Sequence, residues 1–163
     1  MKTDRVAVNA SPLIALFQSD LASLLSQLFS EILVPGAVWE EVLAGGPNDP
    51  ASQQLVTALW AKRVEVAQIP SIITAWNLGQ GESEVLSVAL DNPDCRAMID
   101  DAAARRCARA VGVPTLGTGG AIVLAKRRGL IPSAADALQK LRNTGLWLSD
   151  DLVTLLLEQA GEE

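Results

Sequence analysis

Five short apolar segments, each followed by a pattern typical of a helix, constrain the fold more than any other feature of the sequence. The segments lie at residues 5–9, 32–34, 64–66, 96–99 and 113–116. Short apolar strands that alternate with helices are typical of a parallel sheet that is buried on both faces. The sequence therefore predicts an α/β fold of three layers, with a five-stranded, mainly parallel sheet between two layers of helices.

The length of the chain favours one domain. It has 163 residues, of which 49% are hydrophobic, and this is enough to build one substantial core. Because the chain has two phenylalanines and no tyrosine, the core is expected to be mostly aliphatic. We therefore predict a single domain over residues 1–163.

Residues that favour helix ends accompany the apolar segments. Ser11 and Asp20 are the expected N-caps of the two helices after the first segment, and Ser133 and Ser149 are those of the last two helices. Gly112 is expected to end the helix before it, because glycine readily adopts the left-handed conformation found there.

Composition excludes several classes of function. The chain contains no histidine, which removes the Ser-His and Cys-His nucleophile systems. Its net charge of −6 argues against binding nucleic acid through a basic surface alone, but it allows an acidic site that binds metal ions. We expect a cytoplasmic protein, because the chain has only two cysteines and shows no signal segment. We also expect it to stay out of the membrane, because it has no long apolar stretch.

Polar side chains lie at the carboxyl ends of the predicted strands. Asn9 ends the first segment, and Asp100 and Asp101 follow the fourth. The fifth segment ends at Thr115, Gly117 and Thr118. Because parallel sheets bind ligands beyond the carboxyl ends of their strands, these residues are candidates for a binding site.

Two glutamates in the adjoining helices extend this acidic edge. Glu41 lies in the helix after the second segment, and Glu84 lies in the helix before the fourth. Carboxylates that meet at one edge repel each other unless they bind a cation or change their pKa values. Mg²⁺ and Mn²⁺ prefer oxygen ligands, and two such ions can activate water for phosphodiester cleavage without a histidine.

Five sequence motifs occur in a fixed order around these residues. They are VNASPLI at 8–14, VPGAVWEEV at 34–42, GESEVLSVA at 81–89, MIDDAAAR at 98–105 and TLGTGGAIVLAK at 115–126. Together they resemble the PIN domain family, specifically its bacterial and archaeal PIN-like proteins of unknown role. The resemblance implies a PIN-like fold and a ribonuclease that depends on Mg²⁺ or Mn²⁺. It also implies RNA as substrate, an antitoxin protein as a possible partner, and a homodimer.

The resemblance assigns roles by position. It implies a catalytic set at the edge of the sheet, in which three residues are metal ligands. The catalytic set is Asn9, Glu41, Glu84, Asp100 and Asp101, and the metal ligands are Glu41, Glu84 and Asp101, with Asp100 as the alternative to Asp101. Small residues expected near the metal or the RNA phosphates are Ser11, Thr115, Gly117 and Thr118.

Asn9 departs from the family pattern, which has an aspartate at this position. Asparagine can offer a carbonyl oxygen to a metal, but it brings no charge, so the metal affinity is expected to be lower. An alternative function is therefore a PIN-like module that binds RNA or a partner protein without cleavage. A third reading is a nucleotide-binding protein that uses the glycines of residues 117–120.

Other charged residues have simpler explanations. Glu82 is expected to cap its helix, and Glu40 is expected to be solvated. Basic groups that could contact RNA phosphates, or could simply face solvent, are Lys62–Arg63, Arg105–Arg106 and Lys126–Arg128.

Overall fold

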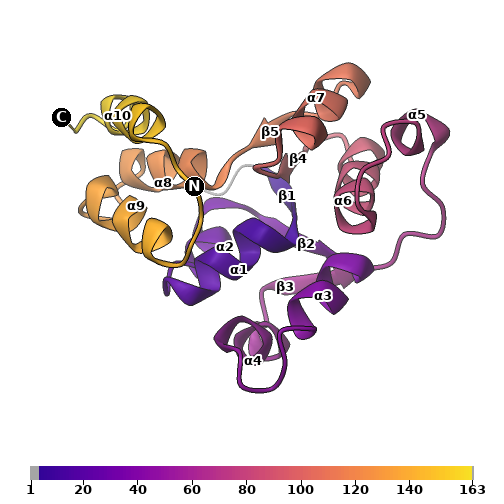
Figure 1. Cartoon of the computed structure of the whole chain (residues 1–163), viewed down its shortest axis with the longest axis horizontal. Coiled ribbons are helices and arrows are strands. Elements are labelled where there is room, and N and C mark those ends of the chain that lie inside the picture. Colours follow the sequence, from indigo (N-terminus) through magenta and orange to yellow (C-terminus); the bar gives the residue numbers. More distant parts are fainter. Residues whose placement is uncertain (1–3, 163) are drawn as a thin grey trace.

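The computed structural model describes residues 4–162 and contains one five-stranded sheet. All strand pairs are parallel, in the order β3-β2-β1-β4-β5 (Figure 1). The strands are β1 (Arg5–Val8), β2 (Glu31–Pro35), β3 (Ala61–Val64), β4 (Cys95–Met98) and β5 (Thr115–Leu116). The predicted α/β class and five-stranded sheet are confirmed, and the sheet is parallel throughout.

The first strand occupies the centre of the sheet. Val6 pairs with Ile32 of β2 on one side and with Arg96 of β4 on the other. The strand order therefore reverses between β1 and β4, where the chain first extends the sheet towards β3 and later returns to add β4 and β5. Such a switch point is where open α/β sheets bind their ligands.

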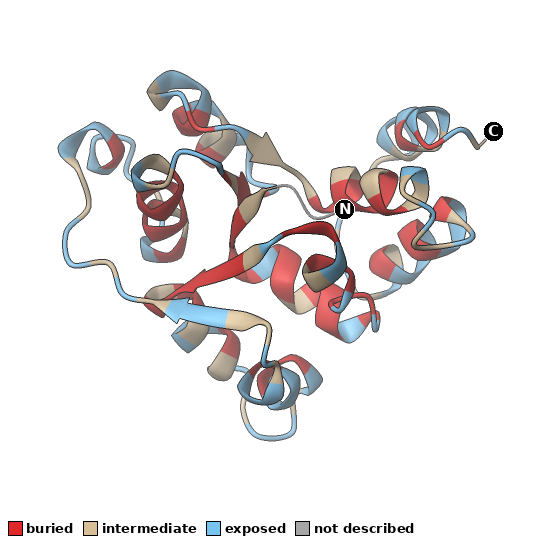
Figure 2. Cartoon of the chain, turned by 180° about the vertical axis from the view of Figure 1, so that it is seen from behind, coloured by how far each residue is buried: buried red, intermediate tan, exposed pale blue. Residues whose placement is uncertain are grey.

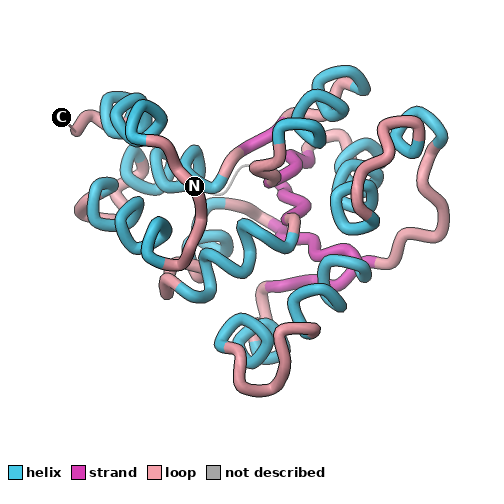
Figure 3. The backbone as a smooth tube through the Cα atoms, viewed as in Figure 1, coloured by secondary structure: helices cyan, strands magenta, loops and turns pink. Residues whose placement is uncertain are grey.

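Helices cover both faces of the sheet, as the tube in Figure 3 shows. The N-terminal half contains α1 (Ala10–Gln18), α2 (Leu24–Leu28), α3 (Gly36–Leu43), α4 (Pro50–Thr57) and α5 (Ser71–Thr74). The C-terminal half contains α6 (Gln80–Asp91), α7 (Ala102–Val111), α8 (Thr118–Arg127), α9 (Ala134–Asn143) and α10 (Asp150–Gln159). Helix α6 packs against β1, β2 and β4, whereas α1, α2 and α8 lie on the opposite side of the sheet.

Several helix ends follow their local signals. The side chains of Ser133 and Ser149 accept hydrogen bonds from Asp136 N and Leu152 N, both at 3.1 Å, and so cap α9 and α10 as predicted. Gly112 ends α7 with φ at +82°, in the left-handed conformation that was expected.

Two predicted caps near the N-terminus are wrong. Helix α1 begins before Ser11, because Leu13 N already donates to the carbonyl of Asn9 at 3.2 Å, so Asn9 takes the N-cap position. Asp20 does not start a helix but helps to end α1, with φ at +59°. The following helix, α2, begins only after Ser23.

The edge strand β3 differs from its predicted position. It covers Ala61–Val64 rather than residues 64–66, because its last partner on β2 is Pro35. The chain turns into α3 directly after Pro35, so Val66 has no neighbouring strand with which to pair.

The core lies on both sides of β1, β2 and β4, where buried residues concentrate (Figure 2). The largest fully buried side chains are mainly aliphatic, as expected, and include Leu13, Leu55, Ile99 and Ile122. Between residues 4 and 162 no helix is both long and apolar enough to cross a bilayer.

Candidate functional site

Asn9 stands directly after β1, at the carboxyl edge of the sheet. Its backbone N–H donates to Met98 O at 3.0 Å, which fixes the end of β1 beside the end of β4. Its side chain is 7% exposed, does not cap α1, and has no hydrogen-bond partner within the part of the chain that the structure describes. The amide is therefore not used to cap the helix that it precedes, and its polar atoms are not sealed from solvent.

Gly81, in the first turn of α6, brings Asn9 and Glu41 to one small space. A Cβ atom added to Gly81 would lie 3.4 Å from Glu41 Oε1 and 3.5 Å from Asn9 Oδ1. Glu41 is exposed and forms no hydrogen bond or ion pair with other residues in the range 4–162. The carboxylate from α3 and the amide oxygen that follows β1 thus face each other across a glycine.

Glu84 is the most buried of the predicted acidic residues, with 8% exposure. Its Oε1 accepts a hydrogen bond from Ala37 N at 3.0 Å, in the first turn of α3. Its Oε2 accepts another from Gln80 Nε2 at 2.8 Å. The carboxylate therefore satisfies the N-terminus of α3 and ties α6 to it, which is a structural role beside any role in metal binding.

Asp100 follows β4 and holds the start of α8. Its Oδ1 accepts from Thr118 N at 2.9 Å and its Oδ2 accepts from Thr118 Oγ1 at 2.6 Å. The carboxylate thus occupies the N-terminus of α8, where the glycine-loop interpretation would place a phosphate. The nucleotide-binding reading of residues 117–120 is disfavoured for this reason.

Gly117 lies close to the side chains of Asp100 and Arg105. A Cβ atom at this position would lie 3.1 Å from Asp100 Oδ1 and 3.0 Å from Arg105 Nη1. Arg105 donates to Ile99 O at 3.3 Å, so its guanidinium is held at the end of β4. Sequence patterns had singled out Arg105 only as one of several basic pairs.

Asp101 is exposed and caps α7, because its Oδ2 accepts from Ala104 N at 2.9 Å. Asp100 and Asp101 therefore point to different helices, α8 and α7. Together with Glu84 on α3, three predicted acidic residues stabilise three helix N-termini at one edge of the sheet.

The remaining predicted residues line two hollows that open at this edge. One hollow of about 280 Å³ is bordered by Ser11 and Glu41 on one side and by residues 144–146 on the other. A second hollow of about 460 Å³ is bordered by Asp100, Thr115 and Gly117. Thr118 lies below the surface, fully buried, with its hydroxyl on Asp100.

The structure brings the predicted residues to one edge but does not join their carboxylates. Within residues 4–162, no three histidine, cysteine or acidic side chains are placed to hold a metal ion together. Gly81 and Gln80 were missed as site residues by sequence reasoning. The signal available was the position of Gly81 inside the first helical turn, where glycine is unfavourable without a packing reason.

Glu82 and Glu40 have the simple roles that were expected. Glu82 Oε2 accepts from Gly79 N at 3.4 Å and so closes the start of α6. Glu40 forms an exposed ion pair with Arg63 at 2.9 Å. Neither carboxylate is needed to explain the polar edge.

Comparison with protein families gives one match that covers almost the whole chain. A family model described as a PIN domain matches residues 5–162. No curated protein matches the chain.

Proposed function

Because the chain belongs to the PIN domain family, we propose that it is a ribonuclease that cleaves RNA phosphodiesters with Mg²⁺ or Mn²⁺. The family points to a nuclease-like function, and the edge that follows β1, β2 and β4 supports a site there. The observation that carries the proposal is the proximity of Asn9 Oδ1 and Glu41 Oε1 at Gly81, where neither oxygen has a hydrogen-bond partner among the described residues and both are open to a ligand.

The residues at this edge fit a hard divalent cation. Asn9 Oδ1 and Glu41 Oε1 are oxygen donors near one point, and the absence of a side chain at Gly81 leaves space between them. Glu84 and either Asp101 or Asp100 are the further ligands that we propose, and their carboxylates would have to turn towards the cation, because residues 4–162 do not place three such groups together. When bound, the metal would lower the pKa of a water molecule and stabilise charge that develops on the phosphate oxygens.

The chain itself would position the reacting groups. Hydrogen bonds to Ala37 N and Gln80 Nε2 hold the Glu84 carboxylate in one orientation. Asp100 is held in the same way by Thr118. Glu41 has no such restraint, so its carboxylate is available to accept a proton from an attacking water.

Further parts of this proposal rest on the family. We propose one PIN-like domain over residues 1–163, an antitoxin-type protein partner, and a homodimer. A reducing, cytoplasmic location is supported by Cys95 and Cys107, which are both free and buried.

A second candidate function is a module that binds RNA or a partner protein without cleavage. Two observations favour it: the neutral Asn9 replaces a charged residue, and no three acidic residues are assembled for a metal ion within the described range. Removal of one charge beside a divalent cation weakens its binding by several kcal/mol, at an effective dielectric constant of about 20.

Cleavage of labelled single-stranded and structured RNA distinguishes the two functions. The wild type, Asn9→Asp and Glu41→Gln are compared in Mn²⁺ and in EDTA. We expect Mn²⁺-dependent cleavage by the wild type, faster cleavage by Asn9→Asp, and at least about 100-fold slower cleavage by Glu41→Gln, as for loss of a general base. An inactive wild type with an active Asn9→Asp variant would instead establish the binding module.

A further inference from the structure

The larger hollow at the site has two unlike walls. Arg105 of α7 and Asp100 border it on the side of β4, and Leu152, Leu155 and Leu156 of α10 border it on the other. Its floor is formed by β5 and the first turn of α8. One wall is therefore polar and cationic, while the opposite wall is apolar.

The cationic wall belongs to a helix whose arginines have no acidic partners. Six other lysines and arginines of the described chain form ion pairs, such as Lys62 with Glu31 at 3.2 Å and Lys126 with Glu162 at 3.2 Å, whereas Arg127 and Lys140 do not. In contrast, Arg105, Arg106 and Arg109 of α7 have no carboxylate within 4.0 Å among residues 4–162. In a chain with a net charge of −6, three unpaired arginines on one helix favour an anionic ligand.

Arg105 is the arginine best placed to bind such a ligand beside the site. Its Nη1 donates to Ile99 O at 3.3 Å, which fixes the guanidinium at the end of β4. A guanidinium has five N–H donors, so further donors remain for a phosphate. Arg109 lies one helical turn further along the same face of α7 and extends the positive charge away from Asp100.

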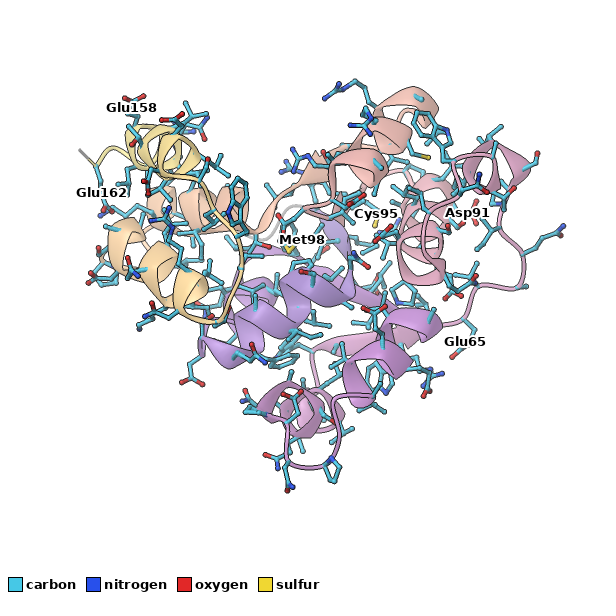
Figure 4. The ribbon with its side chains drawn as sticks, in the orientation of Figure 1. Glu65, Asp91, Cys95, Met98, Glu158 and Glu162 are labelled. Carbon is cyan, nitrogen blue, oxygen red and sulfur yellow. The ribbon has the colours of Figure 1, made fainter. Side chains whose placement is uncertain are left out.

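The apolar wall carries an exposed aromatic side chain. Trp147, in the segment between α9 and α10, borders the same hollow and is 82% exposed. Figure 4 shows Glu158 and Glu162 on the outer side of α10, away from Met98 at the end of β4.

We propose that this hollow binds an unpaired segment of the RNA substrate, with a phosphate on Arg105 and a base stacked on Trp147. The proposal rests on the proposed function, because the same hollow contains Asp100 of the candidate site. A single strand has one charged side and one aromatic side, and a cationic wall opposite an aromatic platform matches both. A protein partner would explain the leucines but not the charge of Arg105, whose hydrogen bond within the described chain goes to the neutral carbonyl of Ile99.

Binding of a fluorescent single-stranded RNA in EDTA tests the proposal without cleavage. The readouts are anisotropy at several salt concentrations and quenching of tryptophan fluorescence by the bases. Trp147→Leu keeps the apolar surface but removes the aromatic face, so we expect about 10-fold weaker binding and loss of most of the quenching. Trp147→Phe is expected to restore most of the affinity.

Arg105→Ala is expected to flatten the salt dependence. Loss of one phosphate contact on a single strand lowers the slope of log affinity against log salt by about 0.7. Arg105→Lys should preserve this slope, which separates loss of charge from loss of the hydrogen bond to Ile99. Matched controls are Arg127→Ala, at the far end of α8, and Trp76→Leu, after α5, and both should bind RNA as the wild type does.

Three results would overturn the proposal. The first is a wild type that does not bind single-stranded RNA. The second is unchanged RNA affinity in Trp147→Leu together with an unchanged salt slope in Arg105→Ala. The third is self-association of the protein that Trp147→Asp abolishes while RNA binding stays intact. The last result would identify a protein interface. A wild type that binds RNA through these residues but does not cleave it would contradict the nuclease function alone.

Discussion

At the scale of single residues, the candidate site depends on which carboxylates are already occupied. Glu84, Asp100 and Asp101 each accept hydrogen bonds from a helix N-terminus, whereas Glu41 has no partner in the described chain. The Asn9 side chain also has no hydrogen-bond partner among residues 4–162, and its amide atoms are not sealed from solvent. The two free oxygens therefore lie close together at Gly81, while the occupied carboxylates are fixed at the starts of three helices.

Gly81→Ala should separate metal binding from stability. The new methyl group would lie in van der Waals contact with Glu41 Oε1 and Asn9 Oδ1, at 3.4 and 3.5 Å, and would fill the space between them. Because alanine favours a helix over glycine by about 0.5–1 kcal/mol, we expect the free energy of unfolding in urea to stay equal or rise. Calorimetric titration with Mn²⁺ should show a loss of affinity of about 10-fold or more.

Gly79→Ala is the matched control for this substitution. Gly79 precedes the same helix, and an added Cβ would lie 3.8 Å from Glu82 only. Equal Mn²⁺ affinity in wild type and Gly81→Ala would remove Gly81 from the site.

Glu84 should contribute to stability independently of any metal. Glu84→Ala leaves Ala37 N–H and Gln80 without their acceptor, and we expect a loss of about 1–3 kcal/mol in the free energy of unfolding. Glu84→Gln keeps one acceptor oxygen and should lose less than half of that. Urea denaturation in EDTA measures both, and equal stability of Glu84→Ala and wild type would contradict the structural role.

At the scale of elements, three helices point their N-termini at one edge. These are α3, α7 and α8, and each is capped by an acidic side chain. The positive ends of helix dipoles favour negative charge nearby, so this edge tolerates several carboxylates in a small region. The arrangement explains how the acidic edge is stable before any cation binds.

Asp101 allows its capping role to be tested separately. Asp101→Asn preserves a good N-cap and should leave thermal stability almost unchanged, whereas Asp101→Ala should cost about 1 kcal/mol. If Asp101 also binds the metal, both variants should weaken Mn²⁺ binding. Full Mn²⁺ affinity in Asp101→Asn would leave Asp100 as the ligand at this position.

Element boundaries set by local chemistry were predictable from the sequence, and those set by partners were not. Gly112, Ser133 and Ser149 act within their own turn of chain, so their patterns were sufficient. Asp20 takes a left-handed conformation to end α1, although its type also suits an N-cap. The limits of β3 depend on where β2 ends at Pro35, which is information from another strand.

The site was predictable to a similar degree. Strand ends placed Asn9 and Asp100 at one edge, because parallel strands share direction. The sequence could not show that Asp100 accepts from α8 and Asp101 from α7, because this depends on where the two helices begin in space. Gly81 as the contact point between Asn9 and Glu41 required the packing of α6 against the start of α3.

At the scale of the whole molecule, the sheet buries both thiols. Cys95 on β4 and Cys107 on α7 are 1% and 0% exposed. Burial raises the pKa of the Cys95 thiol to about 11, from an ordinary value of 9.0. The thiol therefore stays neutral in the folded protein at a pH where the unfolded chain would ionise it.

This shift predicts a loss of stability at alkaline pH. Between about pH 9 and pH 11 the unfolded state loses the Cys95 proton while the folded state keeps it, so stability falls as pH rises. We expect a decrease of about 1–2 kcal/mol across this range. Urea denaturation at pH 8, 9.5 and 10.5 measures it, with Cys95→Ala expected to show a smaller slope. Because burial also raises the pKa of the Cys107 thiol, Cys107→Ala is expected to reduce the slope as well.

The central position of β1 has a consequence for how the chain folds during synthesis. β1 leaves the ribosome before the other strands. Its second edge can pair only after β4 is made, because Arg5 pairs with Cys95. At about 5–20 residues per second this delay is roughly 5–20 s. During that interval the strand can pair with β2 on one side only, and its open edge is accessible to other nascent chains. Pairing between nascent chains should therefore be most frequent when synthesis pauses before residue 98, the last residue of β4. Once β4 is free to pair with β1, the open edge is covered and such pairing should stop.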